Sequence, residues 1–182
     1  IRAQMAAKNY SAAADVAHSA LAQNPNDLRL ATLESTALRR GGKLDQSVAT
    51  LEEFVKRQQD DPDAHVALAN AYFDANKGAQ AVKTLQDAQT RFPAETGITF
   101  QLGAMLDRQK RFNESELVFR QLIAKDPSNA AALNYLGYML AEPLDSGSLV
   151  VLVMVVSVLF VPLVMKWHYP MLVLSWNAFI TP

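Results

Sequence analysis

The fold is decided by a stretch between residues 102 and 127, which reads Leu102-Gly103-Ala104-Met105-Leu106, a polar turn Lys110-Arg111-Phe112-Asn113, then Ser115, Phe119, Leu122 and Asp126-Pro127. Leu102 and Leu106 share one helical face before the turn. After the turn, Ser115, Phe119 and Leu122 follow the i, i+4, i+7 spacing of a second helical face. Neither predicted helix is able to bury its apolar stripe alone. The stretch therefore predicts a helical hairpin that needs neighbours.

The same layout recurs on both sides of this hairpin with a period of about 34 residues, which is typical of stacked helical hairpins. Each unit has a helix rich in small residues, a turn, a second helix and usually a proline. The unit before the hairpin supplies His65, Leu68, Ala69, Tyr72, Ala81, Leu85, Ala88 and Pro93, and the unit after it opens with Leu133, Leu136, Gly137 and Leu140. Two looser units precede them, one with Ala13, Ala17, Ala20 and Pro25, the other with Leu30, Leu33, Ser47, Leu51 and Phe54. In that second unit, Gly41-Gly42 and a second helix that runs to Asp61-Pro62 predict a longer repeat.

These residues resemble the tetratricopeptide repeat (TPR), whose pattern is W-x2-L-G-x2-Y, then A-x3-F, then P. His65 and Thr99 stand where the Trp is expected, so the units are degenerate. The resemblance covers residues 1–142 in about four units. It implies an all-α fold, a right-handed superhelical stack of antiparallel helix hairpins (a TPR-like solenoid).

Helix starts are predicted from side chains that cap a helix N-terminus. Ser11, Asp27 and Asp45 each precede or open an apolar-periodic segment, and Gly41-Gly42 end one. The acidic run around Pro62 is interpreted as capping and solubility, since its spacing is not that of a calcium loop.

Charge and motifs point away from nucleic acid and from catalysis. All 18 acidic residues and 16 of the 17 basic residues lie before residue 146, which leaves this region a formal charge of −2. The three histidines have no paired spacing, and no nucleophile elbow or phosphate loop is present in the sequence. We therefore expect no enzyme activity, cofactor or metal in this chain, which we interpret as a fragment of a longer protein.

The resemblance implies a concave groove lined by the first helix of each pair, and carries the family's groove positions to this chain. The candidate protein-binding residues are Asn70, Phe73, Asp74, Phe100, Asp107, Arg108, Asn134 and Tyr138. Aromatic and amide side chains beside a few charges suit a peptide or helix partner. The alternative is that Phe73 and Phe100 only pack on adjacent hairpins. The family's clamp for C-terminal carboxylates is not matched, because Val66, Ala131 and Tyr135 stand where its cations would be.

The tail changes character after a linker at residues 143–148. Residues 149–165 contain thirteen Leu, Val or Phe and only one polar side chain, Ser157. On an insertion scale, these thirteen sum to about −4 to −8 kcal/mol, which favours a transmembrane helix over 149–166. Trp167 and Tyr169 suit an interfacial loop, and a second apolar segment starts within 167–182. The alternatives are a buried Val-rich strand and a fusion of unrelated segments near Pro143.

Two expectations depend on this tail. Leu133, Leu136 and Leu140 lack the usual second helix and should be more exposed than their counterparts. Lys166 is the only basic residue after the span, so the positive-inside rule places the loop after it in the cytoplasm and the repeats in the periplasm of a bacterium. The function predicted is a membrane-anchored protein-interaction scaffold in the inner membrane. The alternative is an accessory domain of a polytopic membrane enzyme or transporter, one related to polysaccharide for example.

Overall fold

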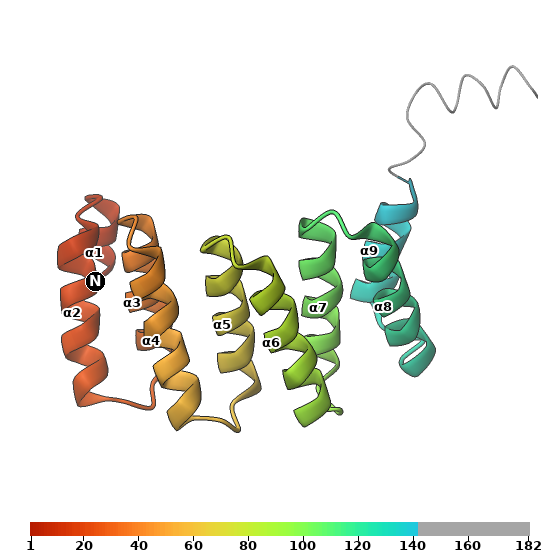
Figure 1. The fold of residues 1–182 in the computed structure, drawn as a ribbon, viewed down its shortest axis with the longest axis horizontal. Helices are drawn as coiled ribbons and strands as arrows, with labels where there is room; N and C mark the ends of the chain where they lie inside the picture. Colours follow the sequence, from red (N-terminus) through yellow and green to blue (C-terminus); the bar gives the residue numbers. More distant parts are fainter. Residues whose placement is uncertain (142–182) are drawn as a thin grey trace, which may run out of the picture. The chain divides into compact units, whose positions relative to one another are not determined.

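A computed structural model describes residues 1–141, and these residues form α-helices joined by short turns, without a strand (Figure 1). The chain divides into two compact units, one formed by Ile1–Leu136 and one that begins at Gly137. The helices are α1 (Arg2–Ala6), α2 (Tyr10–Gln23), α3 (Leu28–Arg40), α4 (Leu44–Arg57), α5 (Pro62–Asp74), α6 (Gly78–Arg91), α7 (Thr96–Arg108), α8 (Phe112–Lys125) and α9 (Ala130–Ala141). The prediction of an all-α helical repeat stack is confirmed.

The repeat keeps a constant period through the described helices. First helices begin at Leu28, Pro62, Thr96 and Ala130, and second helices begin at Tyr10, Leu44, Gly78 and Phe112. The turn between the two helices repeats as well, because residues with positive φ occur at the same spacing, at Lys8, Gly42, Asn76 and Lys110. The prediction of a longer unit around Gly41-Gly42 is wrong, because α4 is 14 residues long, as are α6 and α8.

Helix N-termini follow the predicted chemistry at some starts only. The Asp27 carboxylate accepts hydrogen bonds from the backbone N–H groups of Arg29 and Leu30, as predicted. The Ser11 prediction is wrong, since α2 already begins at Tyr10 and the side chain of Asn9 caps it. In both cases the capping side chain lies just before the first helical residue, where free N–H groups point toward it.

The prediction that Asp45 caps α4 is also wrong. Lys43 occupies the N-cap position without a side-chain hydrogen bond, and Asp45 lies inside the first turn. The Asp45 carboxylate instead accepts a hydrogen bond of 2.7 Å from Lys77 Nζ, and this ammonium lowers the pKa of Asp45. The contact joins the starts of α4 and α6.

The central hairpin packs as the sequence predicts. Leu102 and Leu106 of α7 are buried, as are Ser115, Phe119 and Leu122 of α8. The Phe119 ring lies directly on Gly103, so close that a Cβ at residue 103 would lie 2.7 Å from Phe119 Cε2. The Ser115 hydroxyl donates to the Gly103 carbonyl oxygen at 2.8 Å, which satisfies a buried polar group at the same contact.

The buried face of α3 differs from the predicted one. Leu30 and Leu33 were expected in the core, but both are only half-buried. Glu34 and Ser35 are buried instead, and the Ser35 and Ser47 hydroxyls form a 2.7 Å hydrogen bond between α3 and α4. The constant period explains the difference, because Glu34 falls one repeat before Leu68 and two repeats before Leu102.

The expected exposure of α9, the first helix of the last repeat unit, is confirmed. Leu133 and Leu140 of α9 are 47% and 48% exposed and Leu136 is half-buried, whereas Leu102 and Leu106 are 3% exposed. Among residues 1–141, no helix is both long enough and apolar enough to cross a membrane. The predicted linker 143–148, span 149–166 and segment 167–182 lie outside the described residues.

Candidate functional site

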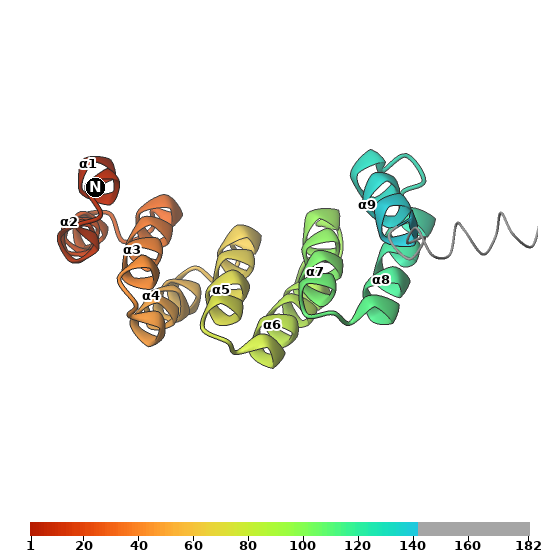
Figure 2. The same cartoon turned by 90° about the horizontal axis from the view of Figure 1, so that it is seen from above.

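The first helices define one face of the unit formed by residues 1–136. Helices α3 and α5 contact each other directly, as do α5 and α7. No two second helices within this unit are in comparable contact. The first-helix side is therefore the inner face of the stack, and the row α3, α5, α7 is visible along one side in Figure 2.

Arg108 at the end of α7 is the centre of the polar groups on this face. Its guanidinium carbon lies 4.0 Å from the ring centroid of Phe73, within the range of a cation–π contact. Its Nη1 donates to Asn70 Oδ1 at 3.3 Å, and its Nη2 lies 3.8 Å from Asp74 Oδ1. Four of the eight predicted groove residues thus lie together across α5 and α7.

Arg39 of α3 extends this group to a third helix. Its Nε lies 3.1 Å from Asp74 Oδ2, so that the Asp74 carboxylate is shared between two guanidinium groups. We call Arg39, Asn70, Phe73, Asp74 and Arg108 the inner strip. Ion pairs this exposed contribute at most about 1 kcal/mol to stability. The strip's charged groups are therefore free to exchange partners with a ligand at small cost.

A groove lies beside the inner strip, between α3 and α5. Its volume is about 400 Å³, within the range of pockets that hold small ligands or single side chains. Asn70, Asp74 and Arg39 line it together with further polar residues, such as Thr32, and with apolar ones, such as Val66. The groove thus offers both polar and apolar side chains to a chain that crosses the first helices.

Phe100 has a different environment from Phe73. Its ring meets the rings of Phe119 and Tyr135 edge-on, with centroids 5.4 and 5.6 Å apart. Phe119 and Tyr135 stack on each other at 4.6 Å. Phe100 therefore belongs to a cluster of rings that packs α7, α8 and the start of α9 together.

The remaining predicted groove residues are spread out. Asp107 accepts a 2.8 Å hydrogen bond from the Tyr135 hydroxyl, which joins α7 to α9. Asn134 is exposed on α9. Tyr138 lies in the second compact unit and is 72% exposed.

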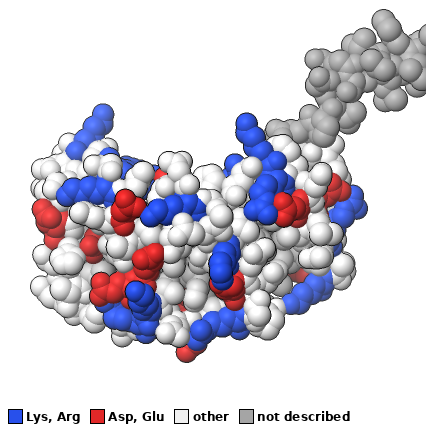
Figure 3. All heavy atoms as spheres, in the orientation of Figure 1, with Lys and Arg blue, Asp and Glu red and all other residues white. Residues whose placement is uncertain are grey.

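Charges of both signs are interspersed over the surface of the repeats. In the view of Figure 3, basic and acidic side chains alternate and no large patch of one sign is visible. This agrees with the formal charge of −2 and gives no support to a nucleic-acid interface. In residues 1–141, no three His, Asp or Glu side chains are grouped as metal ligands would be.

The family comparison decides what these hairpins are. A family model described as "Tetratricopeptide repeat" matches residues 32–96 and 100–142, more than half of the chain. The chain belongs to the tetratricopeptide repeat family.

Solved structures agree with the TPR fold. A thermophilic TPR protein of Thermus thermophilus, TTC0263, superposes with a TM-score of 0.59 at 17% identity, covering 76% of this chain and 77% of that one. A crystal structure of MamA gives 0.53 at 17% identity, covering 77% and 81%. The first TPR domain of Spaghetti (RPAP3), bound to the HSP90 peptide SRMEEVD, gives 0.50 at 18% identity, covering 64% and 94%. At these identities, the likeness shows the fold alone.

Curated relatives are much longer than this chain. TPR repeat-containing protein PA4667 of Pseudomonas aeruginosa is 27% identical over 122 residues, which are 64% of this chain and 20% of that protein. An uncharacterized protein of Aquifex aeolicus is 29% identical over 85 residues, which are 47% of this chain and 11% of that protein. The chain thus spans a fifth or less of the length of either relative.

Sequence reasoning missed Arg39 and Tyr135 as parts of this TPR surface. Arg39 lies one repeat before Phe73 and therefore at an equivalent position on α3. The repeat period carries the signal for Arg39, but the longer repeat predicted around Gly41-Gly42 hides the groove positions of that unit. In the sequence, Tyr135 is distinguished only by standing where the family's carboxylate clamp would have a cation, and its ring contacts depend on the fold.

Proposed function

We propose that the TPR domain is a scaffold whose inner strip binds a segment of another protein. The observation that carries this proposal is the position of Arg108, which contacts a ring, an amide and a carboxylate of α5 at an exposed surface. Family membership supports it, since helical repeats offer extended surfaces to partners. The TPR domain of Spaghetti, solved with a bound peptide, shows that a related fold accommodates such a segment.

The inner strip supplies the two kinds of contact that peptide recognition needs. The Asn70 amide and the Arg108 guanidinium bond to backbone carbonyls or acidic side chains of the segment, and Asp74 accepts from its donors. The half-buried Phe73 ring and the apolar residues of the α3–α5 groove, such as Val66, receive an apolar side chain. Such a combination sets both register and affinity.

We also propose that the scaffold is anchored in a bacterial inner membrane, with the repeats on the periplasmic side. The support is the sequence pattern of residues 149–166 and the single Lys166 that follows them. Reporter fusions at residue 1 and residue 169 test this arrangement. A reporter at residue 1 that is active only in the cytoplasm would reverse the orientation.

The binding proposal is tested with a displayed library of random twelve-residue peptides, selected on the full chain in a non-ionic detergent. Peptides that enrich should bind the variant Asn70→Ala/Arg108→Ala at least tenfold more weakly. Lys83→Ala is the matched control, because Lys83 is an exposed cation on α6 that forms an ion pair with Asp87 of the same helix. The control should bind within twofold of the original chain. Equal binding by the double variant, or no enrichment, would refute the inner strip as a binding site.

A further inference from the structure

Glu34 occupies a core position that the other repeats fill with leucine. Its equivalents one and two repeats later are Leu68 and Leu102, both buried in α5 and α7. The Glu34 side chain is only 9% exposed. A buried carboxylate is costly unless hydrogen bonds surround it, so the TPR packing gives no reason for a glutamate here.

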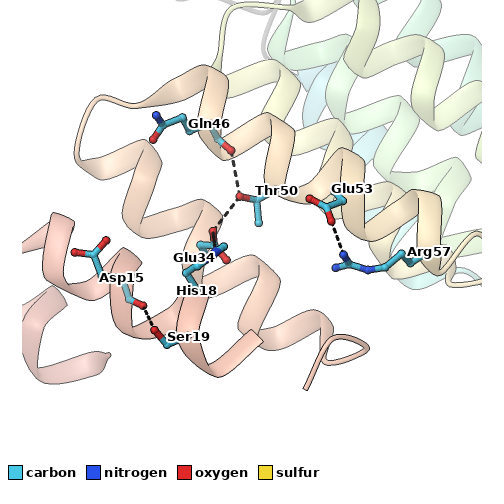
Figure 4. A network of polar contacts seen from close by, with 8 residues as sticks. All are labelled: Asp15, His18, Ser19, Glu34, Gln46, Thr50, Glu53 and Arg57. Carbon is cyan, nitrogen blue, oxygen red and sulfur yellow. Dashed lines mark hydrogen bonds and ion pairs between the residues drawn. The ribbon is translucent and has the colours of Figure 1, made fainter. Parts of the chain in front are cut away.

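The Glu34 carboxylate is incompletely hydrogen-bonded. His18 of α2 donates from Nδ1 to Oε1 at 3.0 Å, and the Thr50 hydroxyl of α4 lies 3.3 Å from the same oxygen (Figure 4). Thr50 has one hydroxyl hydrogen, and the Gln46 carbonyl oxygen at 3.2 Å competes for it. In the described part of the chain, Oε2 is buried without any partner.

This carboxylate lies in the wall of a cavity of about 440 Å³ on the second-helix side of the stack. His18, Gln46, Thr50, Glu53 and Arg57 also line the cavity. Glu53 and Arg57 form an ion pair of 2.6 Å and offset each other, so that Glu34 gives the cavity its negative character. His18 covers the carboxylate, but the His18 side chain is 74% exposed and is able to rotate away into solvent without disturbing the core.

We propose that this cavity binds the guanidinium group of an arginine side chain, which takes the place of His18 against Glu34. A guanidinium presents two parallel N–H donors, which match the two oxygens of one carboxylate. It would thus satisfy Oε2 as well as Oε1, whereas imidazole donates to one oxygen only. A divalent cation fits less well, because the second carboxylate of the cavity, Glu53, is already paired. The cavity is separate from the inner strip, and its occupant is an arginine presented by a partner protein.

The test uses the full chain in a non-ionic detergent with ¹⁵N-labelled histidine. The sequence has three histidines, and a His18→Asn variant assigns the ring signals of His18. N-acetyl-arginine amide is titrated as the probe, with N-acetyl-citrulline amide as its neutral counterpart of the same shape and N-acetyl-lysine amide as an ammonium. We expect a saturable shift of the His18 signals with the arginine compound and binding at least tenfold weaker for the other two.

Two carboxylate variants locate the binding group. Glu34→Gln keeps the shape of the side chain and should weaken arginine binding at least tenfold, whereas Glu53→Gln should change it less than twofold. Equal shifts with arginine and citrulline, equal shifts at His18 and His65, or equal loss in both variants would each overturn the proposal. Because the comparison of the three probes is made on the unmodified chain, it decides the question even if a variant fails to fold.

Discussion

The hairpin of α3 and α4 and the hairpin of α7 and α8 have the same backbone register but different interiors. At equivalent positions, the first has Glu34, Ser35 and Leu51, and the second has Leu102, Gly103 and Phe119. At this contact the first hairpin has a hydrogen bond between two buried hydroxyls, and the second has a ring seated on Gly103 beside the hydrogen bond from Ser115 to the Gly103 carbonyl oxygen. The same TPR backbone register therefore accommodates either a pair of hydroxyls or an aromatic ring with one hydroxyl at this contact.

The largest effect is expected when the polar residue of the first hairpin is placed in the second. Leu102→Glu would bury a carboxylate in an apolar cluster that includes Leu85 and Ile98, and should lower the free energy of unfolding by about 3–5 kcal/mol. Denaturant unfolding of the full chain, followed by the helical signal, measures this. Leu117→Glu is the control, because Leu117 of α8 is exposed and its replacement should change stability by about 0.5 kcal/mol at most. A loss below about 1 kcal/mol for Leu102→Glu would contradict the comparison.

The next effect concerns the ring on the glycine. Gly103→Ala should lower the free energy of unfolding by about 1–3 kcal/mol, since the new Cβ meets Phe119 at 2.7 Å and the ring is held in place by Tyr135 and Phe100. Phe119→Leu in the same chain should recover at least about 1 kcal/mol of that loss, because it recreates the Ala69 and Leu85 pair of the α5–α6 hairpin. A double-mutant cycle by denaturant unfolding measures this coupling.

The control for that cycle is Gly137→Ala in α9. A Cβ at residue 137 would meet no atom of residues 1–141 within 4 Å, so this substitution should stabilise the helix by about 0.5–1 kcal/mol. If Gly103→Ala were stabilising like Gly137→Ala, the contact of the Phe119 ring with Gly103 would not exclude a side chain at residue 103.

The reverse exchange in the first hairpin, from glutamate to leucine, should stabilise the protein. Glu34→Leu should raise the free energy of unfolding by about 1–2 kcal/mol, because it removes a buried carboxylate with an unpartnered oxygen and restores the leucine of the other repeats. The melting midpoint of the full chain should rise accordingly, while Glu53→Leu on the exposed face of α4 should leave it nearly unchanged. A lower midpoint for Glu34→Leu would mean that the carboxylate is needed for folding.

The sequence predicted the second of these hairpins better than the first, and the reason lies in Glu34. Helix positions follow from the repeat period, and the central stripe of Leu102, Leu106, Phe119 and Leu122 is buried as expected. In α3 the same reasoning favoured Leu30 and Leu33, because a carboxylate is not expected in a core. The period alone would have placed Glu34 inside.

The candidate site was predictable in position but not in partners. Asn70, Phe73, Asp74 and Arg108 meet because the repeat sets their places on successive first helices. The sequence does not distinguish Phe73, beneath an exposed guanidinium, from Phe100, among other rings, since both are aromatic residues on first helices. Both rings pack against the core, and only the neighbours supplied by other helices show that Phe73 also carries an exposed guanidinium on one face.

The smallest effect expected lies in the turns of the two hairpins. Gly42 and Lys110 occupy the same left-handed position, with φ of 78° and 61°. A side chain there costs about 1–2 kcal/mol, and glycine avoids this cost, although glycine loses more backbone entropy on folding. Lys110→Gly should therefore raise the free energy of unfolding by about 0.5–1 kcal/mol, and Gly42→Ala should lower it by a similar amount. Lys83→Gly in the interior of α6 is the control for the residue change itself and should destabilise by about 1 kcal/mol. Melting midpoints that fall for both Lys→Gly variants would show that the turn of α7 and α8 is not strained.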